Sequence, residues 1–296
     1  MACKRAPRPL RPRPHGCKSA TRSMPRTTTR LRAILAIGAL GAAGLVAAGS
    51  DPLAGTAEPH QAEAASAAAK RAAKRATAIP GRLLRRGDYE SGNLRQWGNV
   101  ETVNRRRVRV VRSSIQGRFA GRFEVRDGES PLGFGERAEV LIRTGEREGQ
   151  VRWYSWSTKF ARNFPIARRG AWQVVTQWHS KANGSPPLGW FVEGNRLVLR
   201  AHRHSAPGRL LSVRDLWSGP IWRGKWNHIK MRVRWSGSDG RGWVELWMNG
   251  RKVLKRTKVR TMYPGIGNYF KQGYYRCGCL TKTGVVFHDG FRQSRG

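Results

Sequence analysis

The chain has 296 residues, enough for one or two domains with a sizeable core, and its 57 Lys and Arg against 18 Asp and Glu give a formal net charge of +39. Residues 1–64 hold ten of the basic and three of the acidic residues, which leaves residues 65–296 with 47 basic and 15 acidic side chains, a net charge of +32. Most of the positive charge therefore belongs to the folded part of the chain and not to the leader. We predict that the folded part binds a polyanion, which would be an acidic polysaccharide, a nucleic acid or an anionic surface. The alternative is that the genome of the host organism favours Arg codons, so that part of the excess of basic residues is solvated surface charge without a partner.

The N-terminal region has the pattern of an export signal. Residues 1–32 are basic and rich in Pro, and a continuous apolar run follows from Ala33 to Ala48. The run is shorter than the about 20 residues that a membrane span needs, and small residues suited to cleavage follow it. We predict a disordered basic leader with a signal peptide over residues 1–64, secretion of the protein, and no stable membrane span after cleavage. Translation from Met24 would give a conventional signal peptide, and an uncleaved anchor is the alternative.

Residues 65–84 are rich in Ala, Lys and Arg and are predicted to form a linker that is helical in part. Over residues 85–296, short alternating runs of apolar and polar residues recur between Gly, Asn, Asp and Ser. Glu136–Ile142 and Trp226–Trp235 alternate clearly, and Asn249-Gly250 is a strong hairpin signal. This pattern predicts one all-β domain, a jelly-roll sandwich of two antiparallel sheets, with loops at the strand ends that commonly carry function.

The densest chemistry of the chain lies in residues 268–276. If this stretch is extended, Tyr269, Lys271, Gly273 and Tyr275 point to one face. Two phenols and an ammonium group suit proton transfer and anion binding, and the glycine would let a ligand approach the backbone. An ordinary Tyr-rich strand with its lysine in solvent is the alternative.

Two other predicted strands carry polar side chains that suit a catalytic site. Arg137 and Glu139 share one strand face, and Gln177 and His179 share another. Considered separately, Arg137 and Glu139 would form a surface ion pair that contributes little to stability, and His179 would be a solvated histidine. On one concave sheet face they suit β-elimination on a uronic acid, because Arg and Gln donors neutralise the carboxylate, a base takes the C5 proton, and a Tyr hydroxyl protonates the O4 leaving group. This scheme requires no metal or cofactor.

The three segments resemble motifs of the β-jelly-roll alginate lyases. Arg137-Ala-Glu-Val-Leu is similar to an R-x-E-L-R-like strand, Gln177-Trp-His179 to a Q-I-H-like strand, and Tyr269-Phe-Lys-Gln-Gly-Tyr-Tyr275 to Y-F-K-A-G-x-Y. Residues 87–97, 153–156 and 242–250 resemble the wider bacterial polysaccharide lyase family, which includes heparin lyase I-like and glucuronan lyase-like proteins. The resemblance spans about residues 87–292. It implies a concanavalin-like sandwich that cleaves an anionic uronate polymer (alginate, glucuronan or a glycosaminoglycan) to 4,5-unsaturated products, and we expect a monomer.

The resemblance also implies roles by position. Arg137 and Gln177 would bind and neutralise the uronate carboxylate. His179 would be the general base for at least one C5 epimer, and Tyr275 would be the acid and the base for the other epimer. The expected substrate-binding residues are Lys271, Tyr269, Glu139, Arg143 and Arg276, of which Glu139 would orient Arg137 or shape the groove.

The chain departs from the alginate lyase pattern at three positions. Leu141 stands where those enzymes have a second Arg, and Trp178 replaces Ile. Tyr274 precedes Tyr275, so the acid could be either phenol, although strand alternation favours Tyr275. The first two departures leave the substrate open more than the reaction.

Four cysteines divide between the leader and the end of the last motif. Cys3 and Cys17 lie in the predicted leader, and Cys277-Gly-Cys279 follows Arg276. An even pair in an exported protein suggests a disulfide between Cys277 and Cys279, with reduced thiols as the alternative because a bridge across one glycine closes a tight ring. The sequence has no zinc-ligand spacing and no calcium-loop pattern, so no metal site is expected, although a calcium site built from scattered carbonyls would leave no sequence signal.

Three other functions compete with a lyase. A glycosidase needs two carboxylates flanking the scissile bond, but Glu136 and Glu139 are predicted to lie on opposite faces of their strand. A non-catalytic, lectin-like sandwich would not require the set of Gln177, His179 and Tyr275. A nucleic-acid or envelope binding protein would use the same charge, but the export signal and the lack of a nucleic-acid motif disfavour it, and no nucleic acid partner is expected.

Overall fold

The computed structural model describes residues 58–133, 135–168, 170–182, 184–205 and 209–296. The apolar run of the predicted signal peptide, the alternative start at Met24, and the leader cysteines Cys3 and Cys17 lie outside these ranges. Within them, strands dominate, accompanied by one α-helix, α1 (Glu58–Ala76), and one short 3₁₀ helix, η1 (Arg105–Arg107). In the same ranges, no helix is long and apolar enough to cross a membrane.

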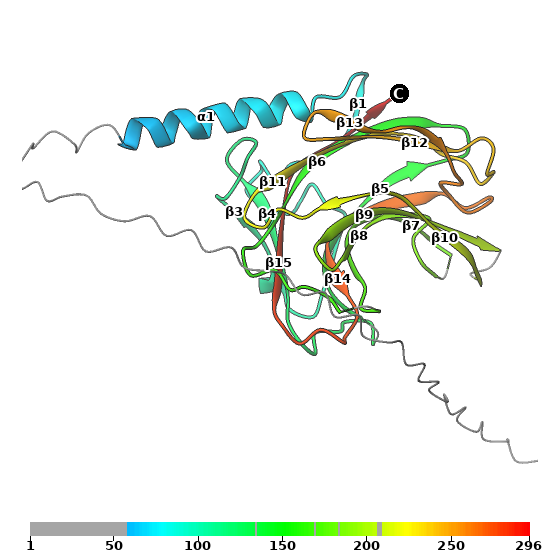
Figure 1. Cartoon of the computed structure of the whole chain (residues 1–296). Helices are drawn as coiled ribbons and strands as arrows, with labels where there is room; N and C mark the ends of the chain where they lie inside the picture. The colour runs from blue at the N-terminus through cyan, green and yellow to red at the C-terminus, as the bar shows by residue number, and fades with distance from the viewer. Residues whose placement is uncertain (1–57, 134, 169, 183, 206–208) are drawn as a thin grey trace, which may run out of the picture. The chain divides into compact units, whose positions relative to one another are not determined.

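The strands form two antiparallel sheets that make the two layers of a sandwich (Figure 1). The first sheet has the spatial order β13 (Arg251–Lys258), β12 (Trp243–Met248), β11 (Trp226–Arg234), β6 (Val151–Phe160), β15 (Gly284–Arg295), β4 (Ala120–Val125) and β3 (Val108–Val111), and β1 (Leu83–Gly87) pairs with β15. The second sheet has the order β10 (Arg209–Pro220), β9 (Arg196–Ser205), β8 (Leu188–Glu193), β7 (Gln173–Ser180), β14 (Asn268–Arg276), β5 (Glu136–Glu146) and β2 (Asn99–Thr102). The predicted jelly-roll sandwich is confirmed.

The core lies between the sheets and follows the alternation seen in the sequence. In β5, Ala138, Val140 and Ile142 are buried, and in β11 the buried apolar side chains are Ile229, Met231 and Val233. Large aromatic side chains fill the middle of the core, namely Trp156, Trp178, Trp190 and Phe270. Each fully buried side chain of this kind stabilises the fold by about 1.5–3 kcal/mol or more, so the sandwich rests on this aromatic layer.

Helix α1 begins at Glu58, before the start of the predicted linker at residue 65, and it buries more than its sequence suggests. Ala73 is fully buried, and Lys70 Nζ donates a hydrogen bond to the Gly117 carbonyl at 3.3 Å. A Cβ atom added at Gly250, in the turn between β12 and β13, would lie 3.8 Å from the Ala76 methyl group. The helix has no stripe of large apolar residues, but small alanine side chains let its backbone approach the first sheet closely.

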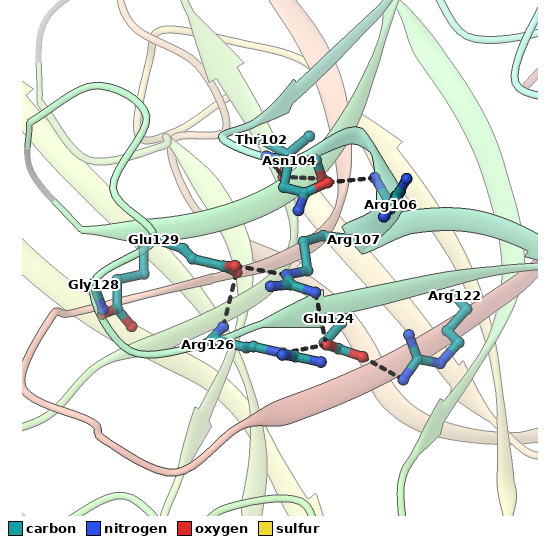
Figure 2. A network of polar contacts seen from close by, with 10 residues as sticks. Thr102, Asn104, Arg106, Arg107, Arg122, Glu124, Arg126, Gly128 and Glu129 are labelled. Carbon is teal, nitrogen blue, oxygen red and sulfur yellow. Dashed lines mark hydrogen bonds and ion pairs between the residues drawn. The ribbon is translucent and has the colours of Figure 1, made fainter.

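A network of arginines and carboxylates fixes the approach to β5 (Figure 2). Glu124, in β4, accepts hydrogen bonds from Arg122, Arg126 and Arg107 at 2.5, 2.6 and 3.3 Å. Arg107 Nε also donates to Glu129 at 2.6 Å. The carboxylates therefore neutralise much of the local arginine charge, and the Glu129 carbonyl in turn accepts a hydrogen bond from the backbone of Arg137 at 3.3 Å.

Candidate active site

A cleft of about 640 Å³ lies on the face of the second sheet that points away from the core. Six of the residues singled out from the sequence line it: Arg137, Gln177, His179, Tyr269, Lys271 and Tyr275. They come from three neighbouring strands, β5, β14 and β7. The three sequence segments meet because β14 is hydrogen-bonded between the other two.

The strand register sets the order of these side chains along the cleft. Tyr269 is paired with His179 across β7, and Lys271 is paired with Gln177. Tyr275 is paired with Arg137 across β5. The imidazole therefore lies toward one end of the row, the ammonium group lies in the middle, and the guanidinium with its phenol lies toward the other end.

Strand alternation in β14 separates the cleft from the core as the sequence predicts. Tyr269, Lys271 and Tyr275 reach the cleft, whereas Phe270, Gln272 and Tyr274 are fully buried. The Tyr274 hydroxyl donates to Gln173 Oε1. Because Tyr274 points into the core, Tyr275 is the phenol of this pair that can meet a ligand.

Gly273 serves the sheet itself. A Cβ atom added there would lie 2.3 Å from the Ala138 carbonyl oxygen and 2.7 Å from Glu139 Cα. Its φ of +150° also lies in a region that other residues rarely adopt. The glycine is thus required by the close approach of β5, which is a different reason from the ligand approach expected from the sequence.

Four ionised groups form the floor of the cleft. Lys271 Nζ lies 2.5 Å from Glu101 Oε2 and 3.0 Å from Glu139 Oε2. Arg137 Nη1 lies 3.0 Å from Glu101 Oε2 and 3.7 Å from Glu139 Oε2. Gln177 Nε2 donates to Glu139 Oε1 at 2.6 Å. Two cations and two carboxylates balance, so the floor carries no net charge although it is lined by Lys and Arg.

The buried charges hold one another ionised. Burial opposes the charge of Lys271, yet Glu139 and Glu101 together raise its pKa above the ordinary value. Burial likewise acts to raise the pKa of Glu101, but Lys271 and Arg137 hold it below the ordinary value. Because Lys271 and Glu139 are 3% and 1% exposed, either would be left as an uncompensated buried charge if its partners were removed.

His179 is held as a neutral imidazole. Burial lowers its pKa, the bond to the Ser180 carbonyl opposes this effect, and the charge of Lys271 lowers the pKa further. His179 Nδ1 lies 2.6 Å from the Ser180 carbonyl oxygen, which can only accept a hydrogen bond. Nδ1 therefore carries the hydrogen, and the neutral ring has its lone pair on Nε2.

The two phenols of the cleft have raised pKa values. Burial raises the pKa of Tyr275, although the Arg137 guanidinium, which lies 3.8 Å over the ring, opposes this effect. Burial also raises the pKa of Tyr269, whose hydroxyl lies 3.4 Å from His179 Nδ1. At neutral pH the cleft thus combines a neutral imidazole with protonated phenols, which is the division that acid–base catalysis needs.

Two expected substrate contacts lie elsewhere. Arg276 is a correction, because it is fully buried and its Nε lies 2.7 Å from Glu136 Oε2, on the face of β14 opposite the cleft. Arg143 is exposed on β5 and does not line the cleft. Cys277 and Cys279, which follow Arg276, are joined in a disulfide with their Cα atoms 5.2 Å apart.

Several cleft residues were not singled out from the sequence. Glu101 lies on the four-residue strand β2, and a lone acid on so short a strand carries no pattern. Trp172 packs edge-on against Tyr275 with ring centroids 4.5 Å apart. Arg200 and His202 come from β9, where the alternation was visible but did not distinguish the cleft face from solvent. In the described ranges, no three His, Cys, Asp or Glu side chains group as a metal site.

Comparison with known proteins gives a consistent result. A family model described as polysaccharide lyase matches residues 89–292. The endo-β-1,4-glucuronan lyase of the fungus Trichoderma reesei is 18% identical with a TM-score of 0.60, and the match covers 73% of this chain and 96% of that one. The alginate lyase Aly36B is 16% identical with a TM-score of 0.50, covering 74% and 98%. No significant match is found among curated proteins.

The fold by itself does not select the reaction. The catalytic domain of a glycoside hydrolase family 131 protein from Coprinopsis cinerea is 12% identical with a TM-score of 0.51, covering 73% of this chain and 95% of that one. At these identities the structural likeness shows a shared sandwich and nothing about its chemistry. The family match and the residues of the cleft are what bear on its chemistry.

Proposed function

Because this chain belongs to the polysaccharide lyase family, we propose that it cleaves a uronic-acid-containing anionic polysaccharide by β-elimination to a 4,5-unsaturated product. The family membership confirms the predicted enzyme class, a polysaccharide lyase, over a non-catalytic lectin. The observation that carries the finer proposal is the cleft, where a neutral His179 and two protonated phenols flank paired cations. His179, Tyr275 and the paired cations each have a role in the elimination.

His179 is the base of the proposed reaction. Its Nε2 lone pair accepts the C5 proton of the uronate, and the electron pair of the broken C5–H bond forms the C4=C5 double bond. The Ser180 carbonyl keeps the hydrogen on Nδ1 and stabilises the imidazolium that forms. Because its pKa is lowered, His179 is ready to accept a proton at neutral pH.

Tyr275 is the acid of the proposed reaction. The C4–O4 bond breaks with its electron pair on O4, and the phenol O–H gives its proton to that oxygen. Arg137, stacked 3.8 Å over the ring, stabilises the phenolate that remains. The imidazolium then loses its proton to solvent and the phenolate takes one from solvent, which restores both groups.

The uronate carboxylate must be neutralised before the C5 proton becomes acidic. Arg137 and Lys271 are the cations of the cleft that can do this. Arg137 and Lys271 already share the carboxylate of Glu101. Glu101 is 21% exposed, whereas Glu139 is 1% exposed and also binds Gln177. We infer that the substrate carboxylate takes over contacts of Glu101 with these cations, while Glu139 keeps Lys271 and Gln177 in position.

The test is a panel of uronate polymers followed by the ultraviolet absorbance of the unsaturated product. Alginate, glucuronan, heparin, heparan sulfate and hyaluronan should include at least one polymer that gives the signal, with the reducing ends rising in proportion. If polymers are cleaved but no product absorbs in the ultraviolet, the reaction is hydrolysis and the proposal of elimination is wrong. A panel with no cleavage at all would overturn the uronate proposal.

The assignment of the acid is tested by comparing two matched variants. Tyr275→Phe should lower kcat by about 10²–10⁴-fold, the range for loss of a general acid. Tyr269→Phe should lower kcat by only about tenfold, since it removes a 3.4 Å contact to His179 and leaves the acid in place. The reverse order would move the acid role to Tyr269.

We further propose that the enzyme acts outside the cell. The motivating feature is the apolar run from Ala33 to Ala48 with small residues after it. Expression of the full chain should yield a secreted protein whose N-terminus lies between residues 48 and 65. A full-length product retained inside the cell would contradict this proposal.

A further inference from the structure

The outward face of the first sheet, on the opposite side of the sandwich from the cleft, carries a second concentration of aromatic and cationic side chains. Its residues alternate with core residues: Trp153 precedes the buried Tyr154, and Trp243 and Trp247 alternate with the buried Val244 and Leu246. Trp153 and Trp247 lie with ring centroids 5.2 Å apart. We call these three tryptophans, with Lys230, Arg232, Lys252, Arg256 and Glu245, the outer-face cluster.

Each cation of the outer-face cluster lies over a tryptophan ring. Lys230 and Lys252 lie 5.2 and 4.6 Å from the centre of the Trp247 ring. Arg256 lies 4.3 Å from Trp243, and Arg232 lies 5.4 and 5.5 Å from Trp153 and Trp243. Such contacts fix the direction of long side chains that would otherwise be free in solvent.

The charges of this cluster are largely uncompensated. Glu245 lies 2.9 Å from Lys252 and 3.8 Å from both Arg232 and Arg256, so one carboxylate serves three cations. Four cations against one acid leave a net charge of +3. The side chains of Arg256, Lys252 and Arg232 are 54%, 42% and 33% exposed.

This arrangement differs from the arginine network of Figure 2, in which carboxylates bind the guanidinium groups and cancel much of their charge. A tryptophan ring orients a cation without neutralising it, because the ring has no net charge. The outer-face cluster therefore presents oriented positive charge to whatever lies above it. A ligand with regularly spaced negative charges is the complementary partner.

We propose that the outer-face cluster is a second binding surface for an anionic polysaccharide, separate from the cleft. The class of polymer rests on the proposed function, since the cleft is proposed to act on the same class. Holding a long chain at a second place raises its effective concentration near the cleft and slows its release. Tryptophans with cations also suit single-stranded nucleic acid, so that ligand is an outcome of the test.

The experiment uses the full chain and two double variants that remove the same charge. Lys252→Ala/Arg256→Ala alters the outer-face cluster, and Arg105→Ala/Arg106→Ala removes two exposed arginines of η1 as the control. Binding to long alginate, glucuronan and heparin chains is measured over a series of salt concentrations. The cluster variant should bind its best polymer about tenfold more weakly at low salt. The slope of the logarithm of the binding constant against the logarithm of the salt concentration should be shallower by about one to two units. The control should change little.

The outcomes separate this proposal from the proposed function. Equal losses in both double variants would reduce the effect to diffuse charge and overturn the proposal. A loss of binding to single-stranded DNA, with polysaccharide binding unchanged, would overturn the choice of ligand. Elimination of a short oligosaccharide should proceed at the same kcat in the cluster variant. If binding depends on the outer-face cluster but no polymer gives an elimination product, the second binding surface is supported and the proposed function is overturned.

Discussion

The cleft and the outer-face cluster use the same cationic side chains in opposite ways. In the cleft, Lys271 is 3% exposed and lies between two carboxylates at 2.5 and 3.0 Å. In the cluster, Lys252 is 42% exposed, lies 2.9 Å from Glu245 and rests 4.6 Å from the centre of the Trp247 ring. A buried charge must be neutralised where it stands, whereas an exposed charge is solvated and can remain available to a partner. The cleft is therefore a fixed, balanced site, and the cluster is a net positive surface.

The largest contrast is expected between two histidines, one on each face. His179→Ala should lower kcat by about 10²–10⁴-fold, because it removes the base of the cleft. His228→Ala is the matched control: burial lowers its pKa too, but it lies on the outward face of the first sheet, 2.9 Å from Ser157 Oγ. Initial rates of absorbance increase at saturating polymer measure both. An active His179→Ala enzyme would remove this residue from the mechanism.

Substitution of one lysine on each face should separate buried from exposed ion pairs. Lys271→Met should reduce the free energy of unfolding by about 3–5 kcal/mol, because Glu101 and Glu139 would lose the closer of the two cations they share and only Arg137 would remain between them. Lys252→Met should cost about 0–1 kcal/mol, since Lys252 is 42% exposed and Glu245 would keep Arg232 and Arg256 at 3.8 Å. Denaturant unfolding followed by tryptophan fluorescence gives both values. Similar values for the two variants would contradict a difference in energy between the buried and the exposed lysine.

Removal of a carboxylate should have different consequences on the two faces. Glu101→Gln should lower KM for a short oligosaccharide about fivefold, corresponding to about 1 kcal/mol for a partly exposed pair, because the substrate carboxylate no longer competes with Glu101. Glu245→Gln should leave that KM unchanged and tighten binding of long polymers instead. If KM rises in Glu101→Gln with kcat unchanged, Glu101 positions Arg137 and Lys271 for the substrate and does not compete with it.

The pH dependence of kcat/KM should report the environment of the cleft. His179 has a lowered pKa, so its neutral form persists below the ordinary value of about 6.5, and the acid limb of the profile should lie below that pH. Tyr275 has a raised pKa, so its protonated form persists above pH ~10. A plateau between these limits is expected for the full chain. An acid limb centred above pH 6.5 would contradict a buried neutral imidazole.

Much of this molecule follows from strand periodicity, which acts locally. Alternation in Glu136–Ile142, Trp226–Trp235 and the β14 segment predicted both the sandwich and the faces of the side chains, including the choice of Tyr275 over Tyr274. The resemblance to the lyase motifs implied that Gln177, His179 and Arg137 share a site with the β14 segment, and the strand order brings them together. Local periodicity suffices here because the side-chain direction of a strand residue depends only on its position in that strand.

Other features depended on contacts between distant segments. Arg276 is an exposed-looking cation in the sequence but pairs with Glu136 across 140 positions, inside the protein. Glu101 is 170 positions from Lys271 and gives no sequence signal, yet it sets the charge of the cleft. Gly273 is required by the close approach of the β5 backbone, and Ala73 is fully buried although α1 has no stripe of large apolar residues.

Residue order and periodicity were enough to predict the class of fold, the strands that carry the motifs, and the resemblance that points to elimination chemistry. The balance of charges became visible only when the strands were placed beside one another. Net charge counts side chains without their partners, and pairing depends on which strands become neighbours. That pairing leaves the floor of the cleft neutral, although it is lined by Arg and Lys, and leaves the outer-face cluster positive.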